Sequence, residues 1–66
     1  MLTMRIGARL KKLRETRGIN QTTLAKKVRV TQAYVAMLES GRGNPTLDVL
    51  QRLAKALKST VAELVK

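Results

Sequence analysis

The stretch "NQTTLAKKVRVTQAYVAMLES" (residues 20–40) contains two short helical patterns separated by only a few residues. Asn20 and Thr31 each precede one of the patterns, and both residue types are preferred at helix N-caps. The apolar residues that recur at helical spacing are Leu24, Ala25 and Val28 in the first pattern and Val35 and Leu38 in the second. We therefore predict helices over residues 21–28 and 32–40, joined by about three residues, which are the dimensions of a helix-turn-helix.

Helical periodicity continues on both sides of this stretch. A first helix is expected from about residue 4 to residue 17, where Gly18 would end it. Thr46 is expected to cap a fourth helix, and Thr60 opens a T-x-x-E capping box for a short terminal helix. The residues expected to face the core are Ile6, Leu10 and Leu13 in the first helix and Leu47, Leu50, Leu53, Ala54 and Leu57 in the fourth, and the apolar residues of the last helix are Val61, Leu64 and Val65.

The strict alternation that is typical of β-strands does not occur in the sequence. Five short helices joined by loops of about 2–5 residues predict an all-α fold. A chain of 66 residues is long enough for one domain. We therefore expect a single compact five-helix domain over residues 1–66, with the helix-turn-helix at about residues 21–40.

The composition excludes several kinds of chemistry. The sequence has no Cys and no His, which rules out disulfides, thiolate metal sites, imidazole ligation and catalysis by either residue type. Its four acidic residues are scattered over different helices and form no obvious catalytic site. We expect neither an enzyme nor a site for a metal or cofactor.

The charge balance indicates the class of partner. The chain has 14 Lys and Arg residues against 4 acidic ones, a formal net charge of +10. Such an excess attracts polyanions, which are nucleic acid, an anionic membrane or an acidic protein. A cationic helix on a membrane surface is disfavoured because regular caps and breaks divide the chain into short helices. No apolar run approaches the roughly 18 residues of a membrane span, and the start of the chain shows no signal peptide. Tyr34 is the single aromatic residue, which disfavours binding of single-stranded RNA by base stacking.

The pattern around the two central helices is more specific than their dimensions. The sequence resembles the lambda-repressor-like (Cro/Xre-type) helix-turn-helix family over essentially its whole length. The residues that carry the resemblance occur in the order typical of the family: Gln21, Leu24, Ala25, Thr31, Gln32, Val35, Glu39, Gly41, Asn44, Pro45 and Leu47. The resemblance implies a sequence-specific regulator of transcription that binds double-stranded DNA, with a cytoplasmic location associated with the nucleoid.

In such a unit the N-terminal end of the third helix enters the major groove. Gln32 is then the first candidate for reading a base, because its amide can pair with adenine N6 and N7. Ala33 and Met37 share the outer face by helical spacing, and both are expected to contact bases. An alternative for Met37 is that it fills a gap in the packing.

Other residues are expected to contact the DNA backbone. Gln21 takes this role from the resembled family, and Asn20 lies beside it at a helix N-terminus, where exposed N–H groups favour phosphate. Tyr34 is expected to bond a phosphate or to brace the flank of the third helix. The backbone-contacting residues predicted in this way are Asn20, Gln21, Thr31, Tyr34, Arg42, Gly43 and Asn44.

Two further expectations follow from the resemblance. Arg14 and Glu39 are expected to form a structural ion pair that ties the first helix to the third. Arg29 and Lys58 stand where the family usually has Gly, so these turns either accept a left-handed residue, at roughly 1 kcal/mol each, or take another geometry.

The family usually binds palindromic DNA as a homodimer. We expect Val61, Leu64 and Val65 at the dimer surface, together with Leu47 or Val49, and no small-molecule ligand. Two alternatives to a dimeric repressor or autoregulator are an antitoxin-type protein-binding module that autoregulates its operon, and a sequence-blind basic DNA-binding protein.

Overall fold

Four of the five helices begin after a residue whose side chain caps them. The computed structural model describes residues 2–66, with side chains from residue 5 onward. Its helices are α1 (Leu2–Thr16), α2 (Gln21–Val28), α3 (Gln32–Glu39), α4 (Leu47–Ala56) and α5 (Val61–Val65). The all-α prediction is confirmed, and no strand occurs among residues 2–66.

The four predicted N-cap side chains all accept a hydrogen bond from the first turn of their helix. Asn20 Oδ1 accepts a hydrogen bond from the Thr23 N–H at 2.8 Å, and the hydroxyls of Thr31, Thr46 and Thr60 accept the N–H three residues further on. Each such bond satisfies a backbone donor that the helix cannot, and its loss typically costs about 1 kcal/mol. Side chains therefore fix the first turn of every helix from α2 to α5.

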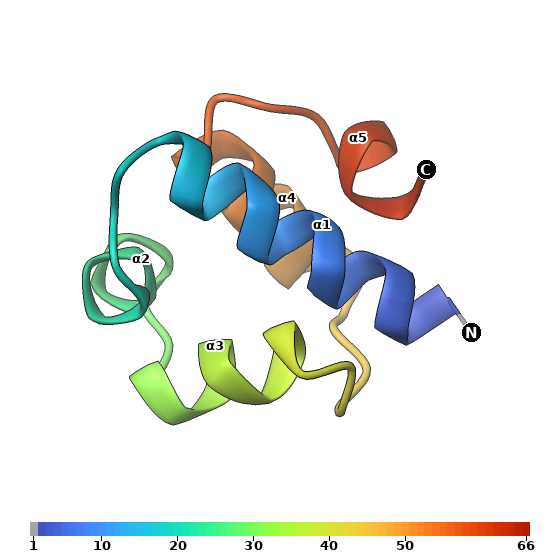
Figure 1. Ribbon diagram of the computed structural model, residues 1–66, viewed down its shortest axis with the longest axis horizontal. Helices are drawn as coiled ribbons and strands as arrows, with labels where there is room; N and C mark the ends of the chain where they lie inside the picture. Colours follow the sequence, from blue (N-terminus) through green and yellow to red (C-terminus); the bar gives the residue numbers. More distant parts are fainter. Residues whose placement is uncertain (1) are drawn as a thin grey trace.

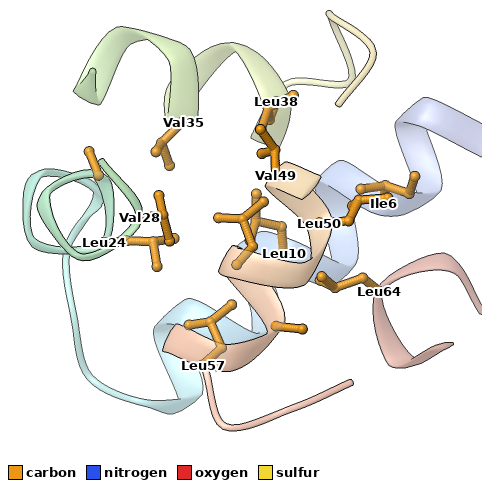
Figure 2. Packing of buried hydrophobic residues seen from close by; sticks show 13 residues of the cluster. Ile6, Leu10, Leu24, Val28, Val35, Leu38, Val49, Leu50, Leu57 and Leu64 are labelled. Carbon is orange, nitrogen blue, oxygen red and sulfur yellow. The ribbon is translucent and has the colours of Figure 1, made fainter. Parts of the chain in front are cut away.

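Helix α1 runs through the middle of the molecule, with α3 on one side of it and α5 on the other (Figure 1). Helix α2 packs against both α3 and α4, and α4 also packs against α5. The space between them is filled by a single cluster of aliphatic side chains (Figure 2). Its members are Ile6, Leu10, Leu24, Ala25, Val28, Val35, Leu38, Val49, Leu50, Leu53, Ala54, Leu57 and Leu64.

Three apolar residues lie elsewhere than the sequence suggested. Leu47 was expected to face the core and was also considered for the dimer surface, and its side chain is exposed, with 62% of its surface accessible. Helical periodicity fixes only the direction of a side chain, and Leu47 is the first residue of α4, where neighbouring helices no longer cover it. Val49 and Leu64, which were considered for the dimer surface, are instead buried in the core of the chain itself.

The structure resolves the geometry of the two turns that lack glycine. Arg29 has φ 62° and ψ 46°, and Lys58 has φ 53°, so both adopt the left-handed conformation. The N–H of Arg29 bonds to the carbonyls of Ala25 and Lys26, which closes the end of α2. Each residue therefore accepts the strain that glycine would avoid.

Gly7 of α1 lies close against the backbone at the C-terminal end of α3. A Cβ atom placed on Gly7 would lie 2.3 Å from the carbonyl oxygen of Leu38 and 3.0 Å from that of Glu39. Both oxygens belong to the backbone, which cannot turn aside as a flexible side chain can. The absence of a side chain at Gly7 thus sets the distance between the two helices.

Substitution Gly7→Ala should destabilise the protein although alanine is the better helix former. Propensity alone would favour alanine by about 1 kcal/mol, but the contact with Leu38 forces α1 and α3 apart, and we expect a net loss of roughly 1–3 kcal/mol. Urea unfolding followed by circular dichroism measures the difference.

The matched control is Ala8→Gly on the exposed side of the same helix, which should cost about 1 kcal/mol through propensity alone. A Gly7→Ala protein that is as stable as wild type or more so would show that the two helices can separate without cost.

Candidate nucleic-acid interface

The buried side of α3 determines which of its residues point outward. Val35 and Leu38 are completely or almost completely buried, so helical spacing turns the other positions outward. Six residues line a shallow surface hollow there, and they are Gln32, Ala33, Ala36, Met37, Ser40 and Arg42. The three residues predicted to contact bases lie together in this set, joined by Arg42 from the predicted backbone contacts.

The remaining predicted backbone contacts lie around this face. Asn20 and Thr31 are exposed, but their oxygens already cap α2 and α3, so each has only part of its side chain free for a phosphate. Tyr34 is half-buried and packs against the core, which fits the flank-bracing alternative. Its side chain is therefore less accessible than expected.

The loop after α3 is held tightly to the helix. The N–H of Arg42 donates to the carbonyl oxygen of Met37 at 3.0 Å, so this backbone donor is used within the protein and the exposed guanidinium is left for a phosphate. Gly43 has φ 76°, and a Cβ there would lie 3.0 Å from Cε of Met37. Asn44 is exposed two residues beyond Arg42. The loop therefore keeps Met37 and Arg42 at one edge of the face.

Arg14 and Glu39 form a buried ion pair, with side-chain exposures of 11% and 4%. Arg14 Nε donates to Glu39 Oε2 at 2.6 Å, and its Nη2 donates to Oε1 at 3.1 Å, which is the bidentate arrangement of the strongest such pairs. The hydrogen bonds that Arg14 donates to Glu39 raise the pKa of Arg14 above its ordinary value, although burial acts in the opposite direction. A third donor of Arg14 reaches the carbonyl oxygen of Ile19 at 2.9 Å.

The ion pair continues into two glutamines. Gln21 Nε2 donates to Glu39 Oε1 at 3.0 Å, and Gln21 Oε1 accepts from Gln32 Nε2 at 2.6 Å. An ionised carboxylate can only accept hydrogen bonds, so Glu39 requires the NH₂ group of Gln21 to face it. The amide oxygen of Gln21 must then point toward Gln32. Gln32 must therefore donate a hydrogen bond to it from its own NH₂ group. One buried charge thereby sets the amide orientation of an exposed side chain.

Sequence reasoning paired Arg14 with Glu39 but missed their extension through Gln21. The bonded residues are separated by 18 and 11 positions, so no local spacing could indicate that the amides meet. Ser40 was also missed. It lies on the same face, where its hydroxyl donates to the carbonyl oxygen of Met37 at 2.7 Å, and its position one turn after Ala36 was the available signal.

A family model described as helix-turn-helix matches residues 10–64. The chain belongs to the helix-turn-helix family. It is 37% identical to the immunity repressor protein of Bacillus phage phi105 over 94% of its length, and 36% identical to the transcriptional regulator DdrOP3 of Deinococcus deserti over 96%. It spans 43% and 49% of these two proteins, which is less than half of each.

Solved structures agree with this assignment. The restriction-modification controller protein C.AhdI from Aeromonas hydrophila superposes with a TM-score of 0.90 at 35% identity, over 94% of either chain. Within residues 2–66, no helix of this helix-turn-helix protein is long and apolar enough to cross a membrane. The same region contains no group of three or more acidic side chains placed to hold a metal ion.

Removing one partner of the ion pair should lower the free energy of unfolding more than removing both partners together. Glu39→Leu leaves the Arg14 guanidinium buried without a counter-charge, and we expect a loss of roughly 3–5 kcal/mol in the free energy of unfolding. The double variant Arg14→Met with Glu39→Leu removes both charges and should recover much of that loss. Urea unfolding of the wild type, both single variants and the double variant gives the coupling energy.

Additive losses in this cycle would mean that the two side chains do not stabilise each other. The exposed pair of Asp48 and Arg52, four residues apart on α4 with nitrogen and oxygen 2.8 Å apart, is the matched control. Asp48→Ala should cost less than about 1 kcal/mol because water screens that pair.

Proposed function

We propose that this protein is a sequence-specific transcriptional regulator that binds double-stranded DNA through the exposed face of α3. The observation that carries the proposal is the chain of hydrogen bonds from Glu39 through Gln21 to Gln32. A side chain that is merely exposed to water needs no hydrogen bonds to hold its amide in one orientation. A side chain that must recognise one base needs its donor and acceptor held in place before binding.

Gln32 retains the groups that adenine requires. Its amide nitrogen carries two hydrogens, of which Gln21 takes one, and its oxygen accepts no bond within the protein among the described residues. The free hydrogen and the oxygen match N7 and the N6 amino group of adenine in the major groove. The small side chains of Ala33 and Ala36 allow the helix to approach the bases closely, and Ala33 fits a thymine methyl group.

Charged and polar groups around this face supply affinity for the DNA backbone. Arg42 stands at one edge of the α3 hollow, and Asn20 with Gln21 stands at the N-terminus of α2, where the helix dipole favours a phosphate. These groups position the helix but read no sequence. The net charge of +10 adds a general attraction that weakens as salt rises. Specificity is therefore assigned to α3 and affinity to its surroundings.

A dimer would let the protein read both halves of a palindromic site. Leu47 is exposed, and Val61 and Val65 are half-buried, so these three residues can contact a second copy, whereas Leu64 cannot. A single exposed leucine is normal on a protein surface, so Leu47 only marks an accessible apolar contact, and the reason for a second copy is the palindromic site. We include a homodimer in the proposal on this basis, with repression of transcription as its simplest outcome.

Selection of bound duplexes from a random pool at about 150 mM salt tests the proposal. The wild type should enrich a palindrome whose half-sites lie about 10 base pairs apart. Gln32→Ala should relax the preference at one base pair in each half, with a loss of roughly 1–3 kcal/mol for the preferred base.

The matched control is Gln51→Ala, which removes the same group from an exposed position on α4 and should leave the selected sequence unchanged. A pool that stays random for the wild type, with binding lost steeply as salt rises, would replace the proposal by sequence-blind binding through charge.

Substitution Leu47→Glu should weaken dimerisation without unfolding the chain, because the side chain is already exposed to water. Sedimentation equilibrium should show a shift toward monomer of roughly tenfold or more in the dissociation constant, as expected for burying a carboxylate against an apolar contact. Thr16→Glu, at the exposed C-terminal end of α1, is the control. An unchanged self-association constant for Leu47→Glu would move the dimer surface elsewhere.

A further inference from the structure

A second concave surface lies between the C-terminal ends of α2 and α4. Two adjoining depressions, of about 450 and 320 Å³, share Lys27, Ala56 and Lys58 and so form one hollow. We call it the basic hollow. Its residues are Arg17, Ile19, Lys27, Arg52, Lys55, Ala56 and Lys58.

The basic hollow is separate from the proposed DNA-reading face. The two surfaces have no residue in common. Leu57, which precedes Lys58, lies at the opposite end of the core from Val35 and Leu38 of α3 (Figure 2). The connection from α4 to α5 likewise runs on the far side of α1 from α3 (Figure 1). A duplex bound on α3 would leave the basic hollow open.

The positive charge of the hollow is poorly compensated. Among the described residues, no acidic side chain lies within 4 Å of Lys27, Lys55 or Lys58. Arg52 pairs with Asp48 at 2.8 Å, yet its Nε atom is buried and has no partner. Five cations thus gather around one paired carboxylate, an arrangement whose mutual repulsion an incoming anion would relieve.

Helix capping explains part of this charge but not Lys58. Lys27 and Lys55 lie in the last turns of α2 and α4, where cations complement the helix dipole. Arg17 already donates to the carbonyls of the two residues that follow α4, at 2.9 Å from the oxygen of Leu57 and 3.3 Å from that of Lys58. Lys58 follows the helix in a left-handed conformation that glycine would adopt without strain. The turn itself gains nothing from a lysine there.

The walls of the hollow indicate a protein ligand. Ile19 and Ala56 are half-buried aliphatic residues set between the cations. A nucleic-acid backbone offers phosphates and sugars to such a surface, whereas an acidic polypeptide offers carboxylates together with apolar side chains. We propose that the basic hollow binds an acidic segment of a partner protein that carries apolar residues between its carboxylates. The site goes beyond the proposed DNA binding and does not depend on it.

Fluorescence anisotropy with a labelled peptide of alternating Glu and Leu tests this proposal on the full chain at about 150 mM salt. The variant Lys58→Gly removes one charge and relieves the strained turn, so the protein should unfold at the same or higher urea concentration while binding the peptide several-fold more weakly. Lys55→Glu with Lys58→Glu should weaken binding by roughly tenfold or more. Lys11→Glu with Lys12→Glu, at exposed positions on α1, is the matched control for net charge.

Two competitors separate the possible ligands. An all-Glu peptide of equal length should bind more weakly than the Glu–Leu peptide, because it cannot use Ile19 and Ala56. A duplex of random sequence should still bind Lys58→Gly as it binds wild type.

Equal loss of peptide affinity in the hollow variants and the α1 control would overturn the proposal, as would equal binding of both peptides. A duplex that loses affinity in the hollow variants, while the peptide does not, would assign the hollow to a second nucleic acid.

Discussion

The buried pair of Arg14 and Glu39 connects the stability of this protein to its chemistry. Arg14 comes from α1 and Glu39 from the last position of α3, so the pair holds the third helix against the centre of the molecule. Burying two charges is costly, and a pair of apolar residues can be equally stable at such a place. The pair does something that apolar residues cannot, because its carboxylate fixes the direction of the Gln21 amide and hence that of Gln32.

Local signals were sufficient for the helices. Asn20, Thr31, Thr46 and Thr60 each stand before a periodic apolar pattern, and each caps a helix in the structure. Such signals act over three or four residues, so one sequence contains them completely. The end of a helix core is less local. Leu47 follows the periodicity of α4 but lies exposed, because the reach of the neighbouring helices decides its burial.

The candidate site was predictable only in part. The outward positions of Gln32, Ala33 and Met37 follow from the spacing of Val35 and Leu38, and the structure places them on one face. Their contacts with bases remain predictions. The bonds of Gln21 depend on three helices meeting, and the basic hollow joins residues from position 17 to position 58. Such sets of residues come together only in the tertiary structure, and no spacing in the sequence predicts them.

Gly7 gives the recognition helix an unusual freedom. Helix α3 is held in place by the close approach of Gly7 to the carbonyl oxygens of Leu38 and Glu39, by the Arg14–Glu39 ion pair and by its buried side chains, and not by its outward side chains. The pose of α3 is therefore insulated from the identity of residues such as Ala33, Ala36 and Met37. Substitutions there can change the chemistry of the exposed face while the helix keeps its place. A backbone contact of this kind separates the evolution of specificity from the maintenance of the fold.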